Sequence, residues 1–234
     1  MDYTKIWVIT ATRKKQSEFL KTTMLGKCLS LYKSQNYFQI KVAIENKEGL
    51  PKIYNRFIED SRHDPAILLF VHDDVFLNDY WWGQQILNAV NQFDLVGIVG
   101  NTQRQKAQLS WYHIVGENNT AEPDDPNNFS GVIGYGTKET FDFINFLGNP
   151  MQPVKLLDGC LLAAKSHIFH EHNIRFDERF DFHFYDVDIC RQFEAKGLSM
   201  GTWPLSIVHK SKGSYPDAYK QAYNSYLAKW HEIP

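Results

Sequence analysis

Short apolar runs alternate with amphipathic stretches through the first hundred residues of the chain. The apolar runs are rich in β-branched and aromatic residues, which predicts buried strands at residues 6–10, 40–45, 66–71 and 95–99. Between them, helical spacing and suitable starting residues predict helices at residues 20–32, from Pro51, and from Asn78 or Asp79 through Val90. The first of these helices has an expected apolar face made of Leu20, Met24, Cys28, Leu31 and Tyr32. Strands that alternate with helices in this way are typical of an α/β fold with a mostly parallel sheet flanked by helices.

The pattern changes after residue 100. Residues 101–150 are rich in Asn, Gly, Pro, Asp and Thr and contain a polar stretch at 117–128, which predicts a long loop or lid. Regular structure returns at 154–163, and we expect a helix at 186–196 that ends before Gly197, a strand at 200–208 and a terminal helix from Pro216 to about Trp230. No internal repeat or linker divides the chain, so we expect one domain over residues 1–234.

Composition and charge narrow the function classes. Hydrophobic residues make up 43% of the 234 residues, which is enough for a substantial core. A net charge of −2 and a pI of about 6.5 argue against nucleic-acid binding. Three widely spaced cysteines argue against a disulfide or zinc framework and fit a reducing, cytoplasmic setting. The chain shows no signal-peptide pattern and no apolar run near the ~18 residues of a membrane span, which leaves peripheral membrane contact open.

The acidic pair Asp73 and Asp74 is the most informative motif. The pair directly follows the apolar run at residues 66–71. Open α/β sheets bind ligands in the crevice at the carboxyl ends of their strands. Adjacent carboxylates at such a place suit a hard divalent cation and a phosphate-bearing ligand. The alternative is a polar turn after a strand.

Polar clusters also stand at other element junctions. Three of them follow predicted strands, at residues 10–13, 45–46 and 209–212. A further cluster, Asp186-Val187-Asp188, begins a predicted helix, where a carboxylate can also serve as a cap. Of its two acids, we expect Asp188 to be structural and Asp186 to be a general base, kept ionised by the helix N-terminus.

Three stretches of the second half resemble a known enzyme family. They are Leu157-Asp158-Gly159 with the small residues that follow, Phe176-Asp177-Glu178-Arg179-Phe180, and the helix Tyr185-Asp186-Val187-Asp188 through Gly197. In this order and spacing they resemble the second half of a family 2-type glycosyltransferase with the GT-A fold. The His72-Asp73-Asp74-Val75 form and the Tyr54-Asn55 pair resemble the subgroup related to a streptomycin-biosynthesis protein.

The resemblance implies a division of labour along one GT-A-like domain. Residues 1–100 would bind the nucleotide donor, 101–150 would form an acceptor or lid region, and 151–234 would carry the catalytic base. The reaction would move a sugar from a nucleoside diphosphate to an acceptor hydroxyl, with inversion. The acceptor class, whether a sugar, a glycan, a lipid-linked or a small molecule, stays open. Trp111, Tyr112 and His113 would either pack against the domain or contact that acceptor.

The resemblance also implies roles for single residues. Asp186 would take the acceptor proton, and Asp74 with His209 would hold Mn²⁺ or Mg²⁺. Glu45 would accept the imide hydrogen of a uracil or thymine ring, which favours a uridine or thymidine donor. The implied donor-binding residues are Thr10, Ala11, Arg13, Glu45, Asn46, Asn55, His72, Asp73, Gly159, Lys210 and Lys212.

Three positions depart from the family pattern. His72 replaces the first Asp of the D-x-D motif, Glu45 replaces the usual Asp, and Tyr185 replaces the usual Glu. The Q-x-x-R-W motif of processive synthases is missing, so we do not expect polymerisation. Two alternatives remain: a non-catalytic nucleotide-sugar-binding or scaffold protein with an eroded site, and a nucleotidyltransferase. The absence of glycine in the basic loop at residues 10–15 argues against the latter.

Overall fold

A six-stranded sheet forms the centre of the molecule. The computed structural model describes residues 5–32, 35–117, 120–210 and 217–232. The sheet has the order β13-β5-β12-β3-β1-β2, and only β12 runs antiparallel to its neighbours. The predicted α/β fold with a mostly parallel sheet is therefore confirmed. The six strands are β1 (Ile6–Ala11), β2 (Phe38–Ala43), β3 (Ile67–Val71), β5 (Leu95–Gly97), β12 (Leu161–Lys165) and β13 (Met200–Thr202).

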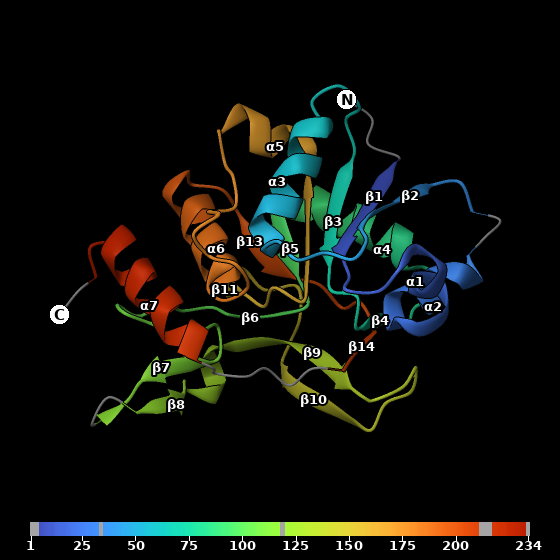
Figure 1. Cartoon of the computed structure of the whole chain (residues 1–234). Coiled ribbons are helices and arrows are strands. Elements are labelled where there is room, and N and C mark those ends of the chain that lie inside the picture. The colour runs from blue at the N-terminus through green and yellow to red at the C-terminus, as the bar shows by residue number, and fades with distance from the viewer. Residues whose placement is uncertain (1–4, 33–34, 118–119, 211–216, 233–234) are drawn as a thin grey trace.

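Helices flank this sheet, as the alternating pattern predicts (Figure 1). In Figure 1, α3 and α6 lie in front of the sheet and α4 lies behind it. Every residue of β3 is buried, because both faces of a central parallel strand are covered by helices. The helices are α1 (Gln16–Thr22), α2 (Met24–Leu31), α3 (Leu50–Asp60), α4 (Trp82–Gln92), α5 (Ser166–Glu171), α6 (Tyr185–Ala195) and α7 (Asp217–Lys229).

A second sheet lies below the first in Figure 1, and residues 101–150 contribute much of it. The order is β11-β6-β9-β14-β4, and β10 pairs with β9. The strands are β4 (Val75–Leu77), β6 (Val99–Asn101), β9 (Phe129–Tyr135), β10 (Phe143–Gly148), β11 (Leu156–Leu157) and β14 (Ile207–His209). A small hairpin of β7 (His113–Val115) and β8 (Ala121–Pro123) and a 3-10 turn at Pro126–Asn128 complete the region. The prediction of a long irregular loop is wrong here, because the segment forms short strands that pair with distant parts of the chain, and Gly131, Gly134 and Asn145 lie within them.

Two predicted strands are each divided between the sheets. The stretch at 95–99 becomes β5 and β6, and the stretch at 200–208 becomes β13 and β14. Each chain segment leaves the central sheet and enters the second one within a few residues. The sequence does not reveal this change of sheet, because the residues before the change and those after it are both buried.

The predicted helix at 20–32 is two helices. Thr23 separates α1 from α2, and its side chain accepts a hydrogen bond from the Gly26 N–H, which caps α2. As a result Leu20 and Leu31 are 42% and 72% exposed, contrary to the apolar face that helical spacing predicts. The buried positions include Phe19 and Leu25 instead.

Other helix boundaries follow the sequence signals more closely. Pro51 lies in the first turn of α3, and α6 ends before Gly197, whose φ of +69° is the left-handed conformation that glycine tolerates. The fourth helix begins at Trp82, later than predicted, and Asp79 accepts a hydrogen bond from the Trp81 N–H. Among the described residues, none of the helices has both the length and the apolar character needed to cross a bilayer.

Candidate active site

A cavity of about 420 Å³ opens where the parallel strands of the central sheet end. Its lining comes from the ends of β1 and β3, from the second sheet, and from the start of α6. The residues expected from sequence that line it are Thr10, Ala11, His72, Asp73, Asp74, Gly159, Asp186 and His209. The cavity therefore collects polar groups from both halves of the chain, as expected for the crevice of an open α/β sheet.

Strand pairing brings Asp74 and His209 together. Strand β14 runs antiparallel to β4, which places His209 opposite Val75, and the Lys210 N–H donates to the Asp74 carbonyl. The His209 Nε2 lies 3.4 Å from the Asp74 Oδ1. This distance is long for a hydrogen bond, and the buried Nε2 has no hydrogen-bond partner within the described residues.

His72 completes a group that can hold a cation. One ligand atom from each of His72, Asp74 and His209 lies within 4.8 Å of the others. Two imidazole nitrogens beside a carboxylate oxygen are more usual around a first-row transition-metal ion, Mn²⁺ included, than around Mg²⁺. The unpaired, buried Nε2 of His209 also fits this group, because a cation would give it the partner that the protein does not provide.

The His72 side chain is held on several sides. Its Nε2 lies 2.7 Å from the Tyr185 hydroxyl, and its ring stacks on Phe182. Burial, followed by the neighbouring His209, lowers the pKa of His72 to about 4. The imidazole is therefore neutral at neutral pH, which is the form that binds metal.

Asp73 lies in the same cavity but bonds differently. Its Oδ2 accepts a hydrogen bond of 2.6 Å from the Thr12 hydroxyl. Burial is the largest influence on this carboxyl and raises its pKa, with Asp74 acting in the same direction. Asp73 is thus tied to the loop after β1 and stands apart from the His72, Asp74 and His209 group.

Asp186 also lines the cavity, from the first turn of α6. Its Oδ2 accepts from the Gly159 N–H at 3.2 Å, and its Oδ1 accepts from the Val187 N–H at 2.9 Å. Burial and then the nearby Asp158 raise the pKa of Asp186 to about 7. The expectation that the helix N-terminus keeps this carboxylate ionised is therefore corrected, since desolvation outweighs the backbone donors.

The residue before this turn holds an unusual backbone conformation. Phe184 has a φ of +67°, in the left-handed region that bulky residues rarely adopt. Its ring is buried against Tyr219, Tyr223 and Tyr226 of α7. Such outliers persist only where the surrounding packing enforces them, and they gather at functional sites. Here the packing sets the direction in which α6 presents Asp186.

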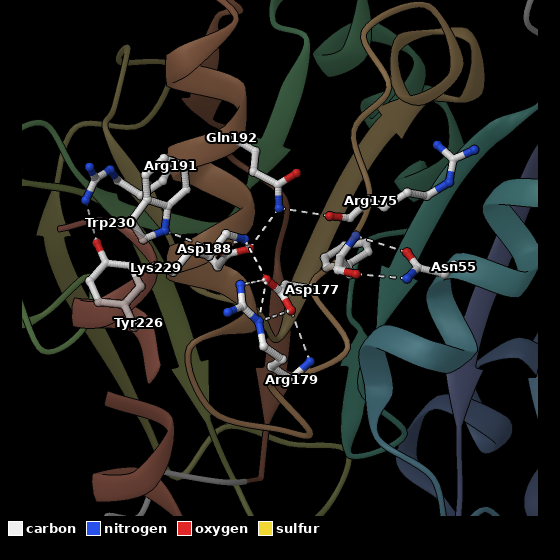
Figure 2. A network of polar contacts seen from close by, with 11 residues as sticks. Asn55, Arg175, Asp177, Arg179, Asp188, Arg191, Gln192, Tyr226, Lys229 and Trp230 are labelled. Carbon is white, nitrogen blue, oxygen red and sulfur yellow. Dashed lines mark hydrogen bonds and ion pairs between the residues drawn. The ribbon is translucent and has the colours of Figure 1, made fainter. Parts of the chain in front are cut away.

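Asp188 joins α6 to the C-terminal helix. Its buried carboxylate accepts hydrogen bonds from Gln192 Nε2, Lys229 Nζ and Trp230 Nε1, and Lys229 also pairs with Asp177 (Figure 2). Asp188 is fully buried and does not line the cavity. The two acids of the Asp186-Val187-Asp188 cluster therefore face different environments, one the cavity and the other the support of α6.

Several residues expected to bind the donor do not line the cavity. They are Arg13, Glu45, Asn46, Asn55 and Lys210, whereas Lys212 lies outside the described residues. The Asn46 N–H donates to the Thr12 carbonyl, so the loops after β1 and β2 meet beside the cavity. Glu45 is exposed there, with a left-handed φ of +48°.

Asn55 has a different function in the fold. Its Nδ2 donates to the Phe176 carbonyl and its Oδ1 accepts from the Phe176 N–H (Figure 2). The Nδ2 also donates to Glu178. The side chain thus fastens α3 to the segment that leads to α6. Its neighbour Tyr54 lines the cavity, because successive residues of a helix face different directions.

The structure adds residues that sequence reasoning missed. Asp158 lines the cavity, accepts from Trp111 Nε1 at 2.6 Å and raises the pKa of Asp186. Tyr135 of β9 lines it as well, and its ring stacks over His209. The acidic residue in the quoted Leu157-Asp158-Gly159 stretch was the available signal for Asp158. Tyr135 had none, because its strand was expected to be a loop.

Aromatic and imidazole side chains form a further wall of the cavity. They come from residues 109–113, which precede and begin β7, from the loop before α6 and from α7; the members are Trp111, Tyr112, His113, Phe182, His183, Phe184 and Tyr219. Tyr112 stacks on Phe129 at a ring distance of 4.8 Å, which connects this wall to the second sheet. The wall is apolar and broad, properties suited to the flat faces of a ring-shaped ligand.

Comparison with known proteins assigns the family. No curated protein matches the chain. Residues 5–230 match the family described as glycosyltransferase-like, which is nearly the whole chain and includes every residue placed in the cavity. The order of elements, the polar groups at the strand ends and this match agree, and the chain belongs to the glycosyltransferase-like family.

Proposed function

We propose that this protein transfers a sugar from a nucleoside diphosphate to an acceptor hydroxyl, with a divalent cation and with inversion. The observation that carries the proposal is one cavity lined by two unlike polar sites. One is the group His72, Asp74 and His209, and the other is Asp186 with a raised pKa. A leaving diphosphate needs positive charge, and an attacking hydroxyl needs a base.

The group of His72, Asp74 and His209 would hold the cation. When bound there, a divalent cation would supply positive charge that balances a departing diphosphate. The Lys210 side chain is exposed next to this group, while its backbone N–H holds the Asp74 carbonyl. Asp74 is therefore positioned through its backbone, which leaves its carboxylate available to a cation.

Asp186 is the candidate base. A pKa near 7 places a carboxyl close to the optimum for accepting a proton at neutral pH. The hydrogen bonds from the Gly159 and Val187 N–H groups orient both of its oxygens. The acceptor hydroxyl would give its proton to this carboxylate as it attacks the anomeric carbon from the face opposite the diphosphate.

The aromatic wall is the candidate acceptor side. Trp111 is held by its hydrogen bond to Asp158, and Tyr112 by its stacking on Phe129. Residues 101–150 thus provide a preformed surface beside Asp186. For the donor, a uridine or thymidine nucleotide remains our proposal. Its base would extend past Thr10 and Ala11 toward the exposed Glu45.

Calorimetry with uridine, thymidine, guanosine and adenosine diphosphates, with and without Mn²⁺, tests the donor half of the proposal. We expect tighter binding of one pyrimidine nucleotide when Mn²⁺ is present. Release of free nucleoside diphosphate from the matching nucleotide sugar, on addition of acceptors, then tests transfer. Metal-dependent binding without hydrolysis or transfer would instead favour a nucleotide-sugar-binding protein with an eroded site. Nucleotide binding that ignores Mn²⁺ would refute the metal assignment.

A further inference from the structure

The hydroxyl of Tyr185 lies between two hydrogen-bonding groups. It is 2.8 Å from the Gly159 carbonyl oxygen and 2.7 Å from the His72 Nε2. A phenolic hydroxyl has one proton to donate and can accept through its lone pairs. Its proton can therefore serve only one of the two neighbours at a time.

The Gly159 carbonyl decides where the proton goes. A carbonyl oxygen can only accept, and the Tyr185 hydroxyl is the donor found for this one in the described residues. Turning the proton toward His72 would leave a buried carbonyl unpaired, which costs about 1–3 kcal/mol. The hydroxyl therefore donates to Gly159, and the short contact with His72 requires a proton on the imidazole Nε2.

We propose that Tyr185 is a positioning residue that holds His72 in the Nε2–H tautomer, so that Nδ1 presents its lone pair to the metal. A neutral imidazole with a proton on Nε2 has its free lone pair on Nδ1. This inference rests on the proposed metal site.

The packing around the pair supports a fixed geometry. Tyr185 is 2% exposed and contacts the rings of Tyr54 and Phe176. A Cβ atom at Gly159 would come within 2.4 Å of the Tyr185 hydroxyl, so only glycine leaves room for the phenol at this position. Phe182 stacks on the His72 ring at 5.6 Å. Partners that orient a metal-binding histidine in this way typically affect metal affinity by 10–100-fold.

The tautomer can be read without any metal. Long-range ¹H–¹⁵N correlation spectra of the ¹⁵N-histidine-labelled, metal-free protein near neutral pH distinguish a protonated ring nitrogen from an unprotonated one. We expect His72, assigned by comparison with a His72→Gln variant, to show a protonated Nε2 and an unprotonated Nδ1. The reverse pattern in the native protein would overturn the proposal, and no metal is needed to observe it.

Removal of the hydroxyl tests the consequence. In Tyr185→Phe, we expect the His72 signals to move toward a mixture of tautomers and the affinity for Mn²⁺ to fall by about 10–100-fold. Mn²⁺ binding is measured by electron paramagnetic resonance in the absence of nucleotide. Tyr226→Phe is the matched control, because it also removes a buried, hydrogen-bonded hydroxyl, on α7 and away from the cavity. A Tyr185→Phe protein with native tautomer signals and native Mn²⁺ affinity would refute the inference.

Failure of the two proposals is distinguishable. If the native protein binds no Mn²⁺, Co²⁺ or Mg²⁺, the metal part of the proposed function fails and the Nδ1 ligand role fails with it. If the native protein binds metal and Tyr185→Phe binds it equally well, only the role of Tyr185 fails.

Discussion

The Asp74 Oδ1 and the His209 Nε2 lie 3.4 Å apart, although one residue follows β3 and the other ends β14. The antiparallel pairing of β4 with β14 creates this proximity. With His72, the two residues form the group that we propose for a divalent cation. A second sheet built largely from the middle of the chain thus completes a site that the central sheet begins.

Replacement of Asp74 tests the metal site directly. Asp74→Ala should remove the effect of Mn²⁺ on nucleotide binding, because a methyl group cannot replace a carboxylate ligand. Loss of an orienting partner alone costs about 10–100-fold in metal affinity, so loss of a ligand should cost at least that. Calorimetry with a nucleoside diphosphate measures the change. Asp64→Ala, at a carboxylate that is 51% exposed and outside the cavity, is the control and should bind as the native protein does.

Replacement of Asp186 tests the base. Asp186→Asn should lower turnover by about 10²–10⁴-fold and leave donor affinity nearly unchanged, because an amide cannot accept the acceptor proton. Turnover with an identified acceptor and calorimetry with the donor separate the two effects. Asp181→Asn changes an exposed carboxylate on the preceding loop and should leave both values close to native. Near-native turnover in Asp186→Asn would remove this residue from the mechanism.

The pH dependence of turnover should carry the signature of Asp186. Because burial and Asp158 raise its pKa to about 7, the base is protonated at pH 5 and becomes active as the pH rises through about 7. Three other titratable groups interact with this carboxyl: Tyr185, Cys160 and Cys190. The pKa of each is raised, so all three stay neutral between pH 5 and 8. A bound cation would shift the rise to lower pH. A flat turnover profile between pH 5 and 8 would contradict the assignment.

The same shift predicts an effect on stability. The pKa of Asp186 in the folded protein, about 7, lies above the ordinary aspartate pKa of 3.8 that applies to the unfolded chain. Between these two pH values the folded protein retains a proton that the unfolded chain releases. The contribution of Asp186 to stability is therefore intact below about pH 4 and is lost as the pH rises toward 7. The free energy of unfolding of Asp186→Asn, measured relative to that of the native protein, should therefore be higher at pH 8 than at pH 4. The expected difference is up to about 3 kcal/mol after allowance for partial solvent contact. Urea unfolding of both proteins at the two pH values measures the difference, and an equal difference at both would count against the raised pKa.

Asp188 should affect stability more than chemistry. Asp188→Ala leaves the Trp230 N–H and the Gln192 amide without this partner, while the Lys229 ammonium keeps Asp177, so the loss of stability should be about 1–3 kcal/mol. Urea unfolding of the metal-free protein measures this loss. Asp60→Ala, at the exposed end of α3, is the control and should change stability little. A stable Asp188→Ala protein without activity would place Asp188 in the chemistry instead.

Most strands of the central sheet and three residues of the site can be predicted from the amino-acid sequence alone. The apolar run at residues 66–71 predicts a buried strand, and the acids that follow it indicate a functional strand end. Both predictions are possible because each signal lies within a short stretch of the chain. The helix that begins at Tyr185 was equally clear, from its apolar spacing and from Gly197 at its end. For the same reason, Asp74, Asp186 and His209 could be proposed before their positions in space were known.

Which of the candidate residues lie in one cavity depends on the tertiary structure and cannot be read from the sequence. Asn55 and Asp73 both have polar side chains of the kind that bind ligands, yet Asn55 is bonded to Phe176 outside the cavity, whereas Asp73 lines the cavity and is bonded to Thr12. The second sheet, and with it Tyr135, was invisible in a glycine-rich and asparagine-rich segment, because its short strands are stabilised by partners distant in sequence. The pKa of Asp186 was also decided in space, because burial and Asp158 act through the fold and no neighbour in sequence reveals them.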